Sequence, residues 1–504
     1  MKITPSILYD YLQCPHKVWR DKHGPKEEEV VEDNPFVQLL WEKGVQHEKQ
    51  IISDFGEDYE DISEGTLEDR LVRTKKALNE KKKYIYQGVI QHGNLFGIPD
   101  LLQLTDSGNY VPVDIKSGSG LEGTDEEFGE EGKPKKHYAV QLSLYADILI
   151  SSGHSKEKIG YVIDINKDKV EYNLTVPMGP KTPQSFWDFY LETKVTVESL
   201  IQNTSSNSPA MAGVCKLCSW HDSCKTWAKN NDDATQLFYV GRTVRDTLQK
   251  DIGISTVKGL TGISTADLLA QKKKNKEFLK GIGDSKLNSA VKRANIFSKQ
   301  LPPVLYEKID IPSVSYELFF DIEDDPTQEF VYLHGIYVRT KEKKEFKYFV
   351  TKDNSRKSEK ETWAEFWKYI KSLPPNDFAV YYYSHHEKST YKKLQKKYPD
   401  IISSEEVEAF FENPKVIDLY QTVLKHTDWP ISSYSLKGLA TYLGFKWRDV
   451  TPSGALSIQW YNEYLKDSDP AKLNRILEYN EDDCIATMVL KDKLNEMNNN
   501  IILE

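Results

Sequence analysis

The spacing of apolar and polar residues predicts an α/β protein. Short apolar or alternating runs predict strands. These runs are 84–90, 110–115, 159–165, 316–322, 330–339 and 346–351. A longer apolar pattern with helical spacing runs from His137 to Ser151, between the second and third strands. Between 226 and 300 the pattern changes to short helical runs punctuated by glycines. No repeat of 20–50 residues is found, so a solenoid is not expected.

Changes in composition divide the chain into three predicted domains. The tract 202–212 is rich in Ser, Asn and Pro and predicts a loop. From Leu301 a new apolar pattern begins. A chain of 504 residues is too long for a single hydrophobic core. We therefore predict domains at 1–225, 226–300 and 301–504.

The bulk composition indicates a globular protein inside the cell. Hydrophobic residues make up 39% of the chain and charged residues 29%. No apolar run reaches the ~18 residues that span a bilayer, and the first residues lack the pattern of a secretion signal. We expect a cytoplasmic protein without membrane contact. Five unevenly spaced cysteines favour metal binding over disulfides in that compartment.

The net charge of −10 argues mildly against a nucleic-acid ligand, because phosphate binding relies on Lys and Arg. Charge is unevenly distributed, however. The segment 271–300 holds nine basic residues against Glu277 and Asp284. It is either a solvated helix face or a phosphate-binding surface.

The N-terminal domain has a pattern of acids typical of a metal-dependent hydrolase. Asp100 ends the segment GIPD, and Asp114 lies in VDIKSG, 14 residues later. Lys116 follows Asp114 by two residues, so strand alternation directs both side chains to one face. Two carboxylates that hold a cation beside an ammonium can hydrolyse a phosphodiester. The alternative is a surface hairpin with an ordinary salt bridge.

Other residues can complete this site. His47, in GVQHE, lies on a predicted helix and is a candidate metal ligand, although a lone His is more often structural. Gln141 and Tyr145 are one helical turn apart, so they share a helix face. They can contact a substrate backbone or position Lys116, or belong to the helix surface.

Four of the five cysteines form a candidate cluster. Cys215, Cys218 and Cys224 follow a C-x2-C-x5-C pattern, and Cys14 precedes them by about two hundred residues. Thiolates suit a [4Fe–4S] cluster or Zn²⁺. The arrangement of one plus three favours iron–sulfur, because structural zinc sites more often use two pairs. Cys484 lies in another motif and is assigned to neither site.

The segment from Cys14 to Cys224 resembles the RecB-type nucleases of the PD-(D/E)xK superfamily, most closely the iron–sulfur versions. The resemblance rests on GxxHE at 44–48, PD at 99–100, DIK at 114–116, QxxxY at 141–145 and the cysteines. It implies a restriction-endonuclease-like fold and a [4Fe–4S] cluster that fastens the two ends of the domain. The metal ligands it implies are His47, Asp100, Asp114 and the Ile115 carbonyl. Lys116 would be the catalytic lysine.

The middle domain contains the glycine-marked segment LKGIGDSKLNSAVKRA, 279–294. Gly281 and Gly283 precede a basic helix, and backbone N–H groups at such a turn can hold a phosphate. The segment resembles a helix-hairpin-helix element, which contacts DNA without reading its sequence. We predict that Lys286, Lys292 and Arg293 contact nucleic acid. A simple connector between helices is the alternative.

The C-terminal domain holds a second acid cluster. LFFDIEDD places Asp321 and Glu323 on one face of a strand end, where two such charges need a cation. Far downstream, Tyr479 and Asp483 lie one helical turn apart. Between these motifs, Glu387 and Asp418 are further candidate acids.

This order of motifs resembles the RNase H-like 3′–5′ exonucleases of the DEDD type, in particular the YprB-like domain, which shares the YSLKGLATYLGF pattern at 434–445. The resemblance implies that Asp321, Glu323 and Asp483 bind metal and that Tyr479 orients the attacking water. The usual Asn-x3-Phe-Asp motif is absent, so Glu387 takes the position of the second-motif acid, with Asp418 as a further candidate. A degenerate fold used only for binding is the alternative.

The sequence therefore predicts a nuclease with two sites that use Mg²⁺ or Mn²⁺. Its predicted partner is nucleic acid, with DNA ends or single strands favoured. No GxxxxGK[ST] loop is present, so unwinding would need a helicase partner from repair or defence. Two alternatives remain. One is a nucleic-acid-binding scaffold with inactive nuclease folds, and the other is an exonuclease acting on RNA.

Overall fold

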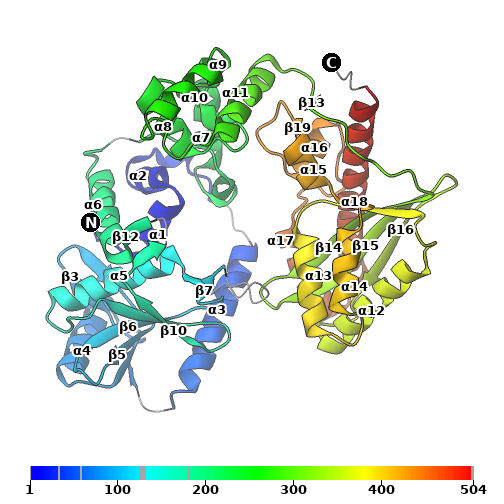
Figure 1. Cartoon of the computed structure of the whole chain (residues 1–504). Helices are drawn as coiled ribbons and strands as arrows, with labels where there is room; N and C mark the ends of the chain where they lie inside the picture. The colour runs from blue at the N-terminus through cyan, green and yellow to red at the C-terminus, as the bar shows by residue number, and fades with distance from the viewer. Residues whose placement is uncertain are drawn as a thin grey trace. The chain divides into compact units, whose positions relative to one another are not determined.

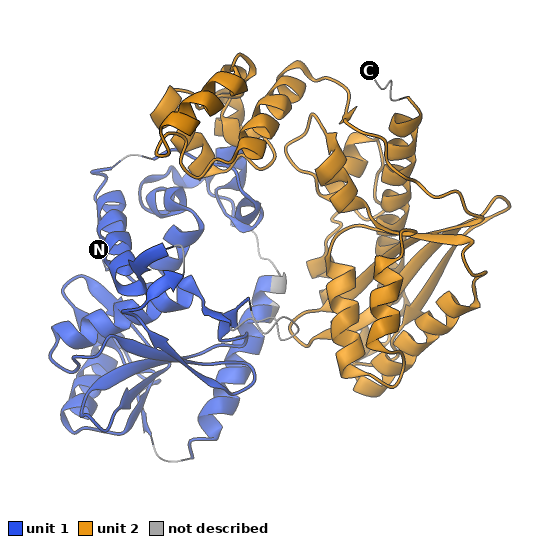
Figure 2. Ribbon diagram, in the orientation of Figure 1, with its two compact units in different colours: residues 1–33, 37–225 blue, residues 34–36, 226–504 orange. Residues whose placement is uncertain are grey.

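The computed structural model describes residues 2–31, 35–56, 59–123, 132–179, 182–205 and 207–500. The chain forms two compact units (Figure 2). Unit 1 comprises residues 1–33 and 37–225, and unit 2 comprises residues 34–36 and 226–504. Each unit is described by itself.

Unit 1 is built on a mixed six-stranded sheet with the order β1-β2-β5-β6-β9-β10. The pairs β1–β2 and β6–β9 are parallel, and the other neighbours are antiparallel. The strands are β1 (Glu60–Asp61), β2 (Tyr84–Tyr86), β5 (Leu101–Leu104), β6 (Tyr110–Ile115), β9 (Ile159–Ile163) and β10 (Lys169–Asn173). The central strand β6 is buried along its whole length, as its continuous apolar sequence predicts.

Helices cover both faces of this sheet. Helix α5 (Lys136–Ser151) shares one core with Leu102 and Val162, and the C-terminal half of α3 (Pro35–Ser53) shares another with Val113 and Ile115. The remaining helices of unit 1 are α1 (Pro5–Gln13), α2 (Pro15–His23), η1 (Lys26–Glu28), α4 (Leu67–Asn79), α6 (Phe186–Ile201) and η2 (Gly213–Leu217). Helix α7 (His221–Asn230) begins in unit 1, and its residues from Thr226 onward belong to unit 2. Because alternate strand residues face opposite sides, Asp114 faces α5.

Among the described residues of unit 1, three antiparallel pairs of short strands lie outside the main sheet. They are β3 (Ile90–His92) with β4 (Leu95–Gly97), β7 (Leu121–Glu122) with β8 (Lys133–Pro134), and β11 (Pro177–Gly179) with β12 (Thr182–Ser185).

The first part of unit 2 is a small helical bundle with its own core, which includes Leu248, Leu260, Leu279 and Leu287. Its elements are η3 (Ala234–Gln236), α8 (Arg242–Ile252), α9 (Val257–Thr261), α10 (Thr265–Lys274) and α11 (Asp284–Lys299).

The rest of unit 2 contains a five-stranded sheet with the order β16-β15-β14-β17-β18. Strands β14, β15 and β16 of this sheet are labelled in Figure 1. The strands are β14 (Tyr316–Asp325), β15 (Phe330–Arg339), β16 (Lys344–Val350), β17 (Phe378–Tyr382) and β18 (Val416–Asp418). Strand β15 pairs antiparallel with both β14 and β16, whereas β17 pairs parallel with both β14 and β18. A separate strand pair joins β13 (Val304–Leu305) to β19 (Thr427–Asp428).

Strand alternation in β14 separates two hydrophobic cores. Leu318, Phe320 and Ile322 belong to the core beneath α12 (Arg356–Ser372), α13 (His386–Lys397) and α14 (Ser404–Glu412). Phe319 belongs to the opposite core, which holds the long helix α18 (Pro470–Asn499). By the same alternation, Asp321 and Glu323 face α18. The other helices are α15 (Leu419–His426), α16 (Leu436–Tyr442) and α17 (Gly454–Asp467).

The elements agree closely with the sequence pattern. Strands β6 and β15 coincide with the predicted ranges 110–115 and 330–339, and α5 begins one residue before the predicted helix. The predicted strand 84–90 is shorter, because β2 ends at Tyr86 and the following Gln87 adopts a left-handed conformation with a φ of 54°. None of the helices in the described ranges is long and apolar enough to cross a membrane.

Candidate metal centre

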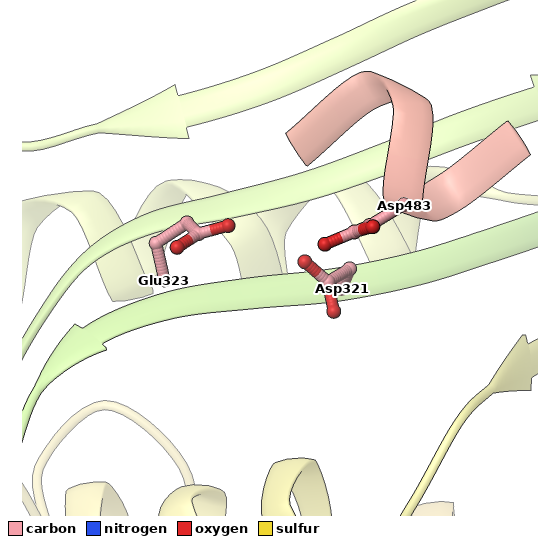
Figure 3. A group of neighbouring side chains, drawn as sticks. All are labelled: Asp321, Glu323 and Asp483. Carbon is pink, nitrogen blue, oxygen red and sulfur yellow. The ribbon is translucent and has the colours of Figure 1, made fainter. Parts of the chain in front are cut away.

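Three acidic side chains converge in unit 2. Asp321 and Glu323 extend from β14 toward Asp483 on α18 (Figure 3). One oxygen from each carboxylate lies within 4.8 Å of the others. Among the described residues, no other group of three or more His, Cys, Asp or Glu side chains meets this spacing. Carboxylate oxygens are the ligands that Mg²⁺ and Mn²⁺ prefer.

This acid cluster is buried and electrostatically unfavourable without a cation. Glu323 and Asp483 are 5% and 8% exposed. Burial, together with the charge of Asp483, raises the pKa of Glu323 to about 8. The pKa of Asp321 rises well above its usual value for the same two reasons. A divalent cation would remove this repulsion, so the donor set fits a metal site.

Asn480 links the helix to the strand. Its side-chain amide donates to Asp321 Oδ2 at 2.7 Å. The approach is close because the residue opposite Asp321 on β15 is Gly335, where a Cβ atom would lie 1.6 Å from Asn480 Oδ1. Only glycine leaves room for this contact. Both residues were missed in the sequence, although Asn480 directly follows Tyr479.

Tyr479 and two further side chains surround Asp483. Tyr479 and Asp483 lie one helical turn apart on α18, and hydrogen bonding from Tyr479 lowers the pKa of Asp483, opposing the effect of its burial. The Trp447 indole donates to Asp483 Oδ1 at 2.7 Å, and Lys437 Nζ donates to the Tyr479 hydroxyl at 3.1 Å. Lys437 and Trp447 come from the segment between α15 and α17. Lys437 lies within YSLKGLATYLGF, which was the one available signal for it.

Glu387 and Asp418 occupy different positions. Glu387, in the first turn of α13, is buried, and its charge helps to raise the pKa of Asp321. Burial raises the pKa of Glu387 itself to about 7. Asp418 caps α15, accepting the N–H groups of Tyr420 and Gln421 at 2.8 and 3.2 Å. Of the two, Glu387 is therefore the better placed to join the cluster.

Unit 1 brings Asp100, Asp114 and Lys116 together. Lys116 Nζ lies 3.0 Å from Asp114 Oδ2. Asp100 Oδ2 accepts the N–H of Ile115 at 2.7 Å. Burial, followed by the charge of Asp114, raises the pKa of Asp100 to about 8. Asp114 is 1% exposed, and neither of its oxygens accepts a well-formed hydrogen bond from the described residues. The 3.0 Å contact with Lys116 is an ion pair, which does not need the donor and acceptor angles that a hydrogen bond needs.

Glu48, the neighbour of His47 on α3, also lies beside these acids and contributes to raising the pKa of the buried Asp100. Gln87 Nε2 donates to Glu48 Oε1 at 2.6 Å and more weakly to Asp100 Oδ1 at 3.4 Å. His47 Nε2 lies 3.1 Å from the Asp164 carbonyl oxygen. Glu48 was missed as a candidate, although it is the last residue of the GxxHE motif.

Gln141 and Tyr145 pair with each other on α5. Gln141 Nε2 donates to the Tyr145 hydroxyl at 3.1 Å, and that hydroxyl donates to the Ile98 carbonyl at 3.2 Å. Tyr145 is buried, and the charges of Asp114 and Asp100 contribute to raising its pKa. It packs so closely on Gly97 that a Cβ atom there would lie 2.4 Å from its ring. In this structure the pair packs against Gly97 and Ile98, the residues just before the segment that holds Asp100.

Four cysteines line one cavity of about 290 Å³ in unit 1. They are Cys14, Cys215, Cys218 and Cys224. Burial raises the pKa of Cys224 to about 11, and the three other thiols add to this increase. Burial also raises the pKa of Cys218, and thiols with raised pKa values ionise readily only beside a cation, so the donor set fits a thiolate-bound metal. Cys484 is buried in α18, in the core of unit 2.

The glycine-marked turn in unit 2 agrees only partly with the predicted phosphate site. Gly281 has a φ of 83°, Gly283 is the N-cap of α11, and Lys286 and Lys292 are exposed. Arg293 is instead buried and pairs with Asp428 at 2.6 Å. Arg293 must be removed from the predicted nucleic-acid contacts, because its guanidinium joins the bundle to the β13–β19 strand pair.

Comparisons with known proteins bear on the C-terminal region. A family model described as the RNase H superfamily matches residues 318–495, which include all three clustered acids. No curated protein matches the chain. A solved protein described as the crystal structure of SSO0001 has 17% identity and a TM-score of 0.18, covering 42% of this chain and 97% of its own. That likeness is too low to carry an argument.

The C-terminal region therefore contains an RNase H-like domain in a mixed α/β protein. This superfamily has a nuclease-type fold that acts on nucleic acid and typically uses divalent metal ions.

Proposed function

We propose that the RNase H-like domain is a metal-dependent exonuclease that removes nucleotides from the 3′ end of a nucleic-acid strand. The observation that carries this proposal is the convergence of Asp321, Glu323 and Asp483 within 4.8 Å. An inert domain would gain nothing from bringing together three carboxylates, two of them buried, because their repulsion costs stability.

Each residue has a defined task in this proposal. The three carboxylates would hold divalent cations, and Glu387 would supply a further oxygen. Bound Mg²⁺ or Mn²⁺ supplies a Lewis acid that stabilises charge on the attacking and leaving oxygens. Asn480 holds Asp321 in its rotamer through the 2.7 Å bond. The Tyr479 hydroxyl, fixed against Asp483, would orient the attacking water.

The test uses full-length protein in a Lys116→Ala background, so that unit 1 does not contribute. Single-stranded DNA labelled at either end is incubated with Mn²⁺ or EDTA. We expect stepwise shortening from the 3′ end that EDTA abolishes and Asp321→Asn reduces at least 100-fold. Glu412→Gln, an exposed acid on α14, is the matched control and should retain full activity. Cleavage that survives Asp321→Asn would refute the proposal, and binding without cleavage would favour a scaffold.

A second activity in unit 1 is favoured by the arrangement of Asp100, Asp114 and Lys116. We propose that this unit is the RecB-like nuclease. The buried Asp114 oxygens and the raised pKa of Asp100 mark a site that a cation would stabilise. Lys116 would orient the water or stabilise charge at the phosphate. The assignment of His47 and of the Ile115 carbonyl as ligands stays a prediction. Loss of endonuclease or end-degrading activity in Lys116→Ala, with the C-terminal activity intact, is the expected outcome.

The four-cysteine cavity is proposed to hold a [4Fe–4S] cluster, with Zn²⁺ as the alternative. Its supporting feature is that Cys14 comes from the start of the domain and the three other thiols from its end. A metal there would close a loop of about two hundred residues and restrict the unfolded chain. We propose that this cysteine site has a structural role. We also propose that the ligand of the whole protein is nucleic acid, which is to be tested first with DNA. A helicase partner stays a prediction.

A further inference from the structure

Lys437 is a cation placed against the acid cluster of the RNase H-like domain. Its Nζ lies 3.1 Å from the Tyr479 hydroxyl and 2.6 Å from the Pro452 carbonyl oxygen. The ammonium also lies 4.9 Å from the centre of the Tyr479 ring. Lys437 is half-buried in the first turn of α16, a helix that packs against α18.

The chemistry of an ammonium group determines the direction of these hydrogen bonds. A lysine ammonium has donors and no acceptor. The Tyr479 oxygen must therefore accept from Lys437, and the Tyr479 proton must point elsewhere. Asp483, one helical turn away on α18, is a carboxylate that can accept this proton when it is ionised. Lys437 and Asp483 together fix the rotation of the hydroxyl.

This arrangement has a consequence for a water molecule at the site. A phenolic oxygen that donates its proton to Asp483 cannot donate to the water. It can accept one water proton, which directs a lone pair of the water away from Tyr479. Water held in that orientation is prepared for attack on a phosphorus atom.

Lys437 also acts on the cluster through its charge. It lowers the pKa of Asp321 and of Asp483, opposing the effect of their burial. Arg475 and Arg448 form ion pairs elsewhere, with Asp449 and with Asp482 and Glu481, respectively. Lys437, unlike these two arginines, donates a hydrogen bond to Tyr479 beside the acid cluster.

The geometry points to Lys437 as a positioning residue that sets the orientation of the Tyr479 hydroxyl and, through it, of the attacking water. This inference rests on the proposed exonuclease function. It adds a residue outside the acidic motifs to that site.

A double-mutant cycle tests the inference, again in full-length protein with Lys116→Ala. We expect Lys437→Met to lower kcat on a 3′-labelled single strand about tenfold, the effect of one charge-assisted hydrogen bond, with KM within about threefold. In a Tyr479→Phe background the same substitution should change kcat less than twofold, because the hydroxyl it orients is gone. Lys437→Arg, which keeps a cation with donors only, should lose less activity than Lys437→Met. Lys466→Met, an exposed lysine on α17, is the matched control.

Binding of Mn²⁺, measured by electron paramagnetic resonance at pH 8.5, provides a readout that does not depend on turnover. Lys437→Met should retain or tighten Mn²⁺ binding, because a competing positive charge has been removed. Loss of Mn²⁺ binding or of the folded state in Lys437→Met would show a structural role and overturn the inference. Additive effects of Lys437→Met and Tyr479→Phe on kcat would overturn it as well. If the unmutated site shows no metal-dependent cleavage, the proposed function fails and the inference fails with it.

Discussion

Gly335→Ala should damage the metal centre without touching any acidic residue. The added Cβ atom would lie 1.6 Å from Asn480 Oδ1 and 2.8 Å from its Cγ, both far inside van der Waals contact. Asn480 is fully buried on α18, so its side chain has no free space to enter. Overpacking costs about 1–3 kcal/mol, and the charge-assisted bond to Asp321 contributes about 1.5–3 kcal/mol if it is lost. We expect a loss of roughly 3 kcal/mol in the free energy of unfolding, measured with urea.

Activity should fall further than stability explains. Displacement of Asn480 releases Asp321 from its rotamer, so exonuclease activity at a temperature where the variant remains folded should fall at least tenfold. The double variant Gly335→Ala/Asn480→Ala removes the colliding atoms and should recover the part of the stability lost to overpacking, about 1–3 kcal/mol, but not the activity. Gly454→Ala is the matched control, because a Cβ atom there meets nothing within 4 Å. A Gly335→Ala variant with native stability and activity would refute this account of how α18 meets β14.

Three further outcomes are expected. The pKa of Glu323 is raised to about 8 in the folded, metal-free protein and is near 4.5 in the unfolded chain, so the stability that this group contributes is fully present below about pH 4.5 and is lost as pH rises toward 8. In EDTA, Tm should therefore fall over this pH range, and Mn²⁺ should restore it. A Tm that changes neither with pH nor with Mn²⁺ would contradict the clustering of these carboxylates. Anaerobically purified protein should contain about four iron atoms per chain, which Cys218→Ser removes together with several degrees of Tm, whereas one zinc per chain would select the alternative metal. Arg293→Met should lower the free energy of unfolding in urea by about 3 kcal/mol, because it leaves the buried Asp428 without its cation. It should not change the salt dependence of DNA binding measured by fluorescence anisotropy. Lys286→Ala should reduce that salt dependence.

Local sequence pattern was sufficient to place the main elements that carry the site. Continuous apolar runs identify β6 and β15 because central strands are buried on both faces. The spacing of Asp321 and Glu323 places them on one face of β14, and the helical spacing of Tyr479 and Asp483 places them on one face of α18. Such periodicity depends only on neighbouring residues, so it can be read without the fold.

Contacts between distant segments could not be predicted in this way. Lys437 lies 42 residues before Tyr479, and Trp447 lies 36 residues before Asp483, so no period relates them to the acid cluster. Gly335 gains its importance from Asn480, which lies far along the chain. Arg293 was misassigned because a basic helix looks solvated in sequence, whereas its partner Asp428 is 135 residues away.

The presence of a cation at the acid cluster is tested most directly by diffraction from crystals soaked in Mn²⁺, with data collected at a wavelength where manganese scatters anomalously. We expect an anomalous peak between the carboxylates of Asp321, Glu323 and Asp483, and the loss of that peak in Asp483→Asn. Manganese bound elsewhere in the crystal, with no peak between these three side chains, would show that the cluster is not a metal site.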